Sequence, residues 1–115
     1  TLSRVFQAFR IELNNEFENI YKATIDAISL LSPGGRLAII TFHSLEDRLV
    51  KNIFRSYARG DGRYLKQMGY DVSDILDREI KILTKKPIMP HRSETLNNKR
   101  ARSAKLRIVE RLAIS

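Results

Sequence analysis

The chain contains no cysteine, which excludes disulfide bonds and thiolate metal sites. Its two histidines, His43 and His91, have no acidic partner at a recognisable ligand spacing, so no metal site is predicted. No apolar run approaches the roughly 18 residues of a membrane span, and no signal-peptide pattern is present. Phosphate-loop glycine motifs and the aromatic sheet pattern of RNA-recognition domains are also missing. Without disulfide bonds or thiolate metal sites, the stability of the fold must come from packing.

Acidic residues are scarce relative to basic ones, with 13 Asp and Glu against 21 Lys and Arg, giving a net charge of +8. The excess lies towards the end: Lys85–Arg111 holds nine basic residues and two acidic, whereas Thr1–Asp47 holds four basic and six acidic. The cluster at Lys99–Lys105 would contact phosphates well and discriminate bases poorly. A nucleic-acid partner is one interpretation, and a solvated basic surface is the other.

Apolar residues at three- and four-residue steps predict helix over residues 2–31, with a break near Asn14. Asn15 and Glu18 resemble a capping box that would start the second helix. The segment Ser32–Gly35 (SPGG) ends the helix in a turn. The predicted buried stripe consists of Leu13, Phe17, Ile20, Thr24, Ala27 or Ile28, and Leu31.

Arg36–Phe42 (RLAIITF) is a short apolar run rich in β-branched residues, which predicts a strand buried on both faces, as in a parallel sheet covered by helices. A second helix should follow, with Ser44 as its N-cap and Asp47 at the third helical position. Gly60–Gly62 should end it. Its predicted apolar stripe is Leu45, Leu49, Ile53 and Tyr57.

The remaining segments complete an open α/β sheet of the kind that alternating helices and strands predict. They are a short helix over Ser73–Arg78, a strand over Ile80–Leu83, a loop over Lys85–Pro90, a helical turn within Ser93–Lys99 and a final strand over Lys105–Leu112.

The predicted strand-to-helix junction at Phe42–Ser44 would lie at the rim of a cleft, because ligands bind outside the carboxyl ends of strands in open α/β sheets. His43 could exchange hydrogen bonds with a polar substrate, or satisfy loop carbonyls only. Glu46 and Asp47, in the first turn, are explained by the helix dipole or by solvation without any chemistry. Both interpretations stay open from the residues alone.

Several blocks together resemble the RsmH (MraW) family of 16S ribosomal RNA (cytosine-N4)-methyltransferases. The most specific are FHSLEDR at Phe42–Arg48 and RARSAKLR at Arg100–Arg107. The segments Arg4–Glu16, Ser32–Leu37 and Leu83–Ile88 match further blocks, namely RxFQALRIxxNxEL, PGGRL and LTKKP, in the family's order. The segment Gly60–Arg78 departs from many members, which carry a cysteine-containing stretch there.

The resemblance implies a chain that forms the C-terminal half of a class I (Rossmann-like) methyltransferase sheet, using S-adenosylmethionine to methylate the N4 of a cytidine. Residues 1–115 would lack the cofactor-binding half and most of the inserted helical domain, so the chain alone should be inactive, and its catalytic residues stay unknown. Since the first residue is Thr1 and not Met, we expect a fragment or a processed product. The base pocket is expected at His43, Ser44, Glu46, Asp47 and Arg48, and contacts to small-subunit ribosomal RNA at Lys85, Lys86, Arg100, Arg102 and Lys105.

The family also implies a cytoplasmic protein, or one of the mitochondrial matrix if the source is eukaryotic. An apolar sheet edge left open by the absent half predicts a homodimer or association through that edge. The alternative to the enzyme is a non-catalytic RNA-binding or ribosome-associated remnant of the family, which would bind ribosomal RNA in a salt-dependent manner without methylating it.

Overall fold

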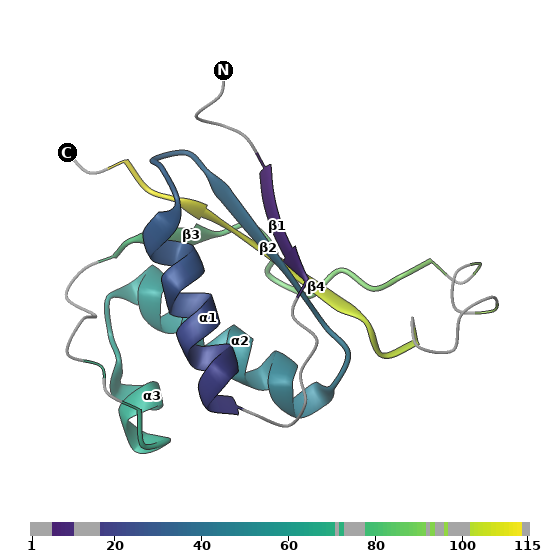
Figure 1. Ribbon diagram of the computed structural model, residues 1–115, viewed down its shortest axis with the longest axis horizontal. Helices are drawn as coiled ribbons and strands as arrows, with labels where there is room; N and C mark the ends of the chain where they lie inside the picture. Colours follow the sequence, from purple (N-terminus) through teal and green to yellow (C-terminus); the bar gives the residue numbers. More distant parts are fainter. Residues whose placement is uncertain are drawn as a thin grey trace.

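A computed structural model describes residues 17–70, 72, 78–91, 93, 96 and 102–113, together with the backbone of residues 6–10. The chain is a mixed α/β structure in which helices connect successive strands of a single sheet (Figure 1). The elements are β1 (Phe6–Arg10), α1 (Phe17–Leu30), β2 (Arg36–Thr41), α2 (Ser44–Arg59), α3 (Arg63–Gln67), β3 (Ile80–Ile82) and β4 (Lys105–Arg111).

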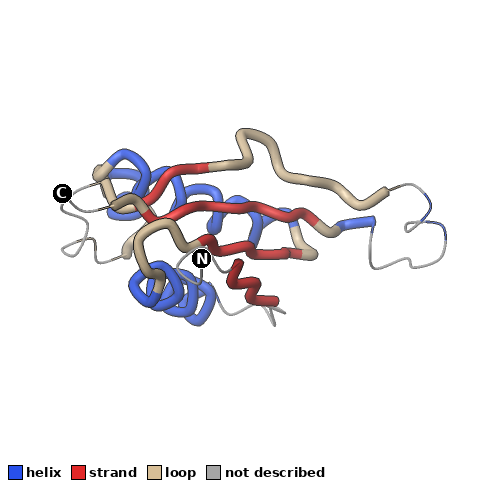
Figure 2. Tube along the Cα trace, turned by 90° about the horizontal axis from the view of Figure 1, so that it is seen from above, coloured by secondary structure: helices blue, strands red, loops and turns tan. Residues whose placement is uncertain are grey.

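The sheet has four strands in the order β1-β2-β4-β3. β1 and β2 are parallel, whereas β4 runs antiparallel to both of its neighbours, β2 and β3. The last strand of the chain therefore inserts between two strands that precede it. Both long helices, α1 and α2, lie on the same side of this sheet (Figures 1 and 2).

The core lies between the sheet and these two helices. β2 contributes Leu37 and Ile39, and β4 contributes Val109, because alternate residues of a strand face the same side. The helices bury their apolar stripes against them: Ile20, Ala27 and Ile28 from α1, and Leu49, Val50, Ile53, Phe54 and Tyr57 from α2. The predicted stripes are thus largely confirmed, although Phe17 and Leu45 are exposed.

The prediction of a helix over the first residues was wrong for Phe6–Arg10, which is strand β1. Its backbone pairs in parallel with β2, with Phe6 opposite Arg36 and Arg10 opposite Ile40. A segment this short has little intrinsic preference, and the hydrogen-bond ladder offered by β2 decides its conformation. The predicted break near Asn14 and the capping box at Asn15 lie outside the described residues.

The other sequence predictions for regular structure fare better. β2, β3 and β4 are confirmed within a residue or two of their predicted bounds, and the turn at Pro33–Gly34 is present, with φ 81° at Gly34. β2 is buried on both faces over Leu37–Ile39, but only its β1 neighbour is parallel. Ser73–Arg78 and Ser93–Lys99 lie mostly outside the described residues.

A long connection joins β3 to the start of β4, and its described residues 83–91 extend away from the body of the molecule (Figures 1 and 2). Its first part runs beside β4, where Ile88 forms an isolated antiparallel bridge with Leu106. The Thr84 hydroxyl accepts a hydrogen bond from the Ile108 amide at 3.0 Å. The predicted loop at Lys85–Pro90 is therefore held against the sheet by one bridge.

Candidate functional site

The junction between β2 and α2 forms one side of the candidate site. β2 ends at Thr41 and α2 begins at Ser44, with His43 as the N-cap in an extended conformation (φ −135°, ψ 137°). The predicted N-cap role of Ser44 was wrong, because Ser44 is already the first helical residue and the N-cap residue is His43, whose side chain makes no capping hydrogen bond. The side chains of His43 and Ser44 are exposed.

A recess of about 340 Å³ opens at this junction. It is lined by Phe42, His43, Ser44, Ser103 and Lys105. The first three belong to the FHSLEDR block and the last two to the RARSAKLR block, so two segments about 60 residues apart in sequence form one recess. Its polar groups are an imidazole, two hydroxyls and an ammonium, which suit hydrogen bonding to a polar, uncharged or anionic ligand.

Asp47 joins the same two blocks beneath the recess. Its carboxylate accepts two hydrogen bonds from the guanidinium of Arg107 on β4, at 2.7 Å from Nε and 2.8 Å from Nη2. The Thr41 hydroxyl donates to the same carboxylate at 3.4 Å, and the Lys105 ammonium lies 4.0 Å away. Bidentate pairs of arginine and carboxylate are geometrically specific and stronger than hydrogen bonds between neutral groups.

Burial distinguishes this pair from a surface contact. The Asp47 side chain is 7% exposed and that of Arg107 10%. The interpretation of Asp47 as a solvated acid was therefore wrong, because its carboxylate faces the sheet and joins the start of α2 to β4. Its predicted place in the first turn of α2, where an acid complements the helix dipole, is confirmed. Arg107 lies two residues beyond Lys105 on the same face of the strand, so the Asp47 carboxylate contacts both Arg107 and Lys105, which lines the recess.

Glu46 is buried as well, with 3% of the residue exposed. Burial raises the pKa of its carboxyl above the ordinary value of 4.5, and the positive charge of His43 lowers it in part. The solvated interpretation is thus wrong for Glu46 too. Arg48, one turn into α2, is exposed and is not among the residues that line the recess.

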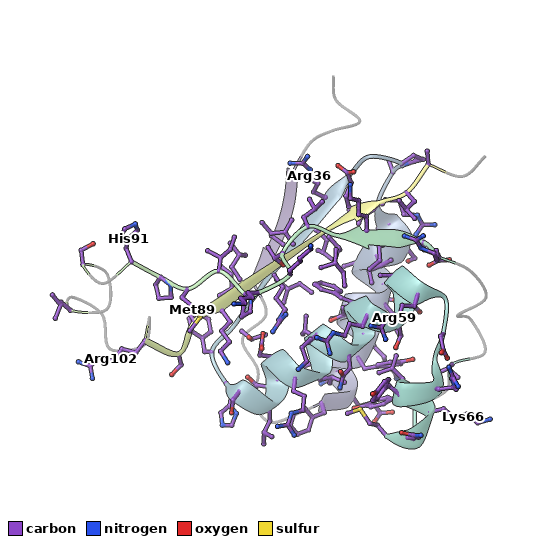
Figure 3. The ribbon with its side chains drawn as sticks, turned by 180° about the vertical axis from the view of Figure 1, so that it is seen from behind. Arg36, Arg59, Lys66, Met89, His91 and Arg102 are labelled. Carbon is purple, nitrogen blue, oxygen red and sulfur yellow. The ribbon has the colours of Figure 1, made fainter. Side chains whose placement is uncertain are left out.

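The described residues among those predicted to contact RNA do not all line one opening. Lys105 lines the recess, whereas Lys85 and Lys86 are exposed at the start of the connection after β3. Arg102 is exposed near the end of that connection, far from Arg59 on α2 (Figure 3). Arg100 lies outside the described residues.

Sequence reasoning missed a second, more basic opening between α2 and β3. This groove has a volume of about 370 Å³. Its charged lining residues are Lys51, Arg55, Arg59, Lys85 and Arg107. The signal was available in the sequence, since positions 51, 55 and 59 are spaced by four and must share one face of a helix.

The recess and the groove do not suit S-adenosylmethionine, the cofactor that the resemblance implies. Within the part of the chain that the structure describes, both are lined by basic and neutral side chains, which would not complement a positively charged sulfonium. Nor do the described residues bring together three or more His, Cys, Asp or Glu side chains that could hold a metal ion. No helix among them has the length and apolar character needed to cross a membrane.

The profile of the MraW methylase family matches residues 1–112, and the chain belongs to that family. Ribosomal RNA small subunit methyltransferase H of Halothermothrix orenii is 51% identical over 110 residues, which cover 95% of this chain and 34% of that protein. The protein of the same name from Fusobacterium nucleatum is 50% identical over 109 residues, covering 95% and 34%.

More distant relatives retain the same coverage. The protein of that name from Mesoplasma florum is 41% identical over 109 residues, which cover 94% of this chain and 35% of the relative. The chain thus spans about a third of the length of the curated relatives that it matches. Membership of the family is shown along nearly the whole chain, and the relatives possess a large part that has no counterpart in these 115 residues.

Proposed function

We propose that the full-length protein encoded by this gene methylates the exocyclic N4 of a cytidine in small-subunit ribosomal RNA, with S-adenosylmethionine as methyl donor. The relatives' names support the rRNA methyltransferase activity, and the resemblance of FHSLEDR and RARSAKLR to the family blocks supports the cytidine. The observation that carries the proposal is the recess in which these two blocks meet above the Asp47–Arg107 ion pair.

In this proposal residues 1–115 are the C-terminal part of a class I methyltransferase domain. The sheet order supports it: β2 would be the fifth strand of the complete sheet, and β3 and β4 its closing strands. The parallel β1–β2 pair leaves β1 at the edge where the absent strands would continue. The cofactor-binding half and most of the inserted helical domain would then lie outside this chain, and the chain alone would be inactive.

The recess would hold the target base. The imidazole of His43 and the hydroxyl of Ser44 are exposed to it and can hydrogen-bond the edge of a cytosine that has left its stack. Methyl transfer to an exocyclic amine depends on holding the nitrogen in line with the donor, and positioning of this kind accounts for large rate effects. Glu46, Asp47 and Arg48 would support the wall rather than react, since Asp47 is engaged by Arg107.

The test is methylation of small ribosomal subunits by the full-length protein with a radiolabelled methyl donor, followed by mapping of the labelled nucleotide. The proposal requires label on the N4 of a cytidine, and a strong loss of label with His43→Ala and Ser44→Ala at unchanged thermal stability. Label on another atom would overturn the N4 assignment. The isolated 115 residues should give no label and no calorimetric binding of S-adenosylmethionine.

A non-catalytic, RNA-binding role is the second candidate, favoured by the basic groove. It requires salt-dependent binding to ribosomal RNA without any methylation by the full-length protein. Methylated subunits in the assay above would exclude it. A cytoplasmic location remains a prediction of the family resemblance.

A further inference from the structure

The groove between α2 and β3 concentrates positive charge on facing walls. One wall is α2, which contributes Lys51, Arg55 and Arg59, and the other is the segment after β3, which contributes Lys85. The floor between them is apolar and formed by Phe54, Ala58 and Ile82. Phe54 is 2% exposed, so the floor offers little aromatic surface for stacking of a base. The ligand that fits these walls is a chain of anions rather than a planar ring.

These charges are not neutralised by carboxylates within the groove. No Asp or Glu is among its lining residues, and no ion pair joins Lys51, Arg55, Arg59 or Lys85 to another residue in the part of the chain that the structure describes. Arg107, the fifth basic residue, is different because Asp47 engages it. The groove therefore presents a net positive charge to an incoming ligand.

The arrangement is unfavourable for the helix by itself. Like charges four residues apart on a helix repel each other, and three of them stand in one row here. The pKa of Lys51 is lowered by burial first, and then by the positive charges of Arg55, Arg107 and Arg48, with Asp47 opposing the effect in part. Two members of the row have a partial structural explanation. Arg59 lies in the last turn, where a basic residue complements the helix dipole, and Lys51 lies one turn after Asp47, whose negative charge favours the charged form of the lysine.

The geometry matches an extended nucleic-acid strand. Successive members of the row are separated by four residues, or about 6 Å along the helix axis, a repeat suited to the successive phosphates of one strand. The row also continues towards the recess. Lys105 lines the recess and Arg107 lines the groove, and these residues are about 7 Å apart on one face of β4.

We propose that the groove lined by Lys51, Arg55, Arg59 and Lys85 binds the phosphate backbone of the RNA strand that flanks the nucleotide held in the recess. The inference rests on the proposed function for the identity of the RNA. It adds a second binding surface, which positions the strand by its backbone and carries no sequence information. Because the floor of the groove is apolar, it offers no polar group to the bases, and the RNA strand would contact the groove through its phosphates.

The experiment compares two triple variants of the full-length protein with equal loss of charge. The groove variant is Lys51→Gln/Arg55→Gln/Arg59→Gln. The control is Lys22→Gln/Lys66→Gln/Lys81→Gln, whose three lysines are exposed and line neither opening. Binding of a labelled 12-nucleotide oligouridine is measured by fluorescence anisotropy across a salt series, without methyl donor.

Loss of the three groove contacts should weaken binding by at least tenfold at low salt. It should also make the slope of log K against log salt shallower by about 2, since each phosphate contact on a single strand contributes about 0.7. The control variant should bind with an affinity within about twofold of that of the unsubstituted protein, and its slope should differ by less than about 0.5. Equal losses in both variants, or none in the groove variant, would overturn the proposal and leave the groove to an acidic protein partner or to solvent.

Two further arms keep the result interpretable. The midpoint of thermal unfolding of the groove variant should be unchanged or shifted upward, because repulsion between the basic residues of α2 is relieved. If the groove variant does not fold, Lys85→Gln on the opposite wall replaces it, with Lys81→Gln as its control. The proposed function fails separately. A full-length protein that binds oligouridine through the groove but methylates no subunit contradicts the methyltransferase assignment and not the groove.

Discussion

The ion pair between Asp47 and Arg107 provides the sharpest prediction of stability. Replacement of Asp47 by leucine removes both hydrogen bonds to the guanidinium, at 2.7 and 2.8 Å, and leaves a charged side chain that is 10% exposed. Loss of one partner of a buried pair typically costs about 3–5 kcal/mol, because the remaining charge stays desolvated. We expect Asp47→Leu to lower the free energy of unfolding by that amount.

Arg107→Met should cost less than Asp47→Leu. The carboxylate left behind retains the Thr41 hydroxyl at 3.4 Å, and the Lys105 ammonium at 4.0 Å is 29% exposed and free to move closer. The double variant Asp47→Leu/Arg107→Met removes both charges and replaces them by apolar groups of similar size. Substitutions of that kind are often neutral, so we expect the double variant to fall within about 1–2 kcal/mol of the parent.

The assay is urea denaturation of the full-length protein and of the three variants, analysed as a double-mutant cycle. A matched control is Glu110→Gln, which removes the charge of Glu110 on β4 and so breaks its ion pair with Arg36 on the neighbouring strand β2. The Arg36 side chain is 50% exposed, and its Nε lies 3.1 Å from Oε1 of Glu110. That change should cost less than about 1 kcal/mol. A cost below 1 kcal/mol for Asp47→Leu, or a double variant equal to the sum of the singles, would refute the reasoning.

Two further predictions concern the same structure. Burial raises the pKa of Glu46 in the folded protein, so its charged form is disfavoured there and its contribution to stability is lost as the pH rises through that pKa. Glu46→Gln should therefore stabilise the protein at pH 7. The gain should vanish below the ordinary pKa of 4.5, where the carboxyl is protonated in the folded and the unfolded protein. An equal gain in thermal midpoint at pH 7 and pH 4 would contradict this. β1 has a strand on one side only among the described residues, so the isolated 115-residue chain should associate through that edge, which sedimentation of a concentration-independent monomer would exclude.

The elements predicted correctly from the sequence are those whose local pattern and tertiary role agree. α2 has an apolar stripe of helical period and a glycine, Gly60, that ends it in the left-handed region at φ 69°. β2 is a short β-branched run that the sheet buries on both faces. In both cases burial in the core stabilises the conformation that the residues already favour locally.

β1 illustrates why other parts could not be predicted. The five residues FQAFR carry no turn signal and no strict alternation, and the apolar spacing of Phe6 and Phe9 is also compatible with a helix. What makes them a strand is the ladder with β2, a partner about 30 residues away in sequence. The pairing of distant segments is determined in the assembled sheet, so the sequence of FQAFR alone does not indicate that it forms a strand.

The candidate site divides in the same way. Resemblance placed His43, Ser44 and Lys105 among the functional residues, and the structure brings these three into one recess. The role of Asp47 could not be read from the helix it begins, because its partner, Arg107, is 60 residues further on.

The two blocks that resemble the family most specifically are thus the two ends of one ion pair. A carboxylate in FHSLEDR is held by a guanidinium in RARSAKLR, and two side chains of the same blocks, the exposed His43 and the half-buried Lys105, line the recess. If the pair acts on positioning, the double variant Asp47→Leu/Arg107→Met should regain stability without regaining methylation of the small subunit. Recovery of both together would mean that the pair contributes to folding alone.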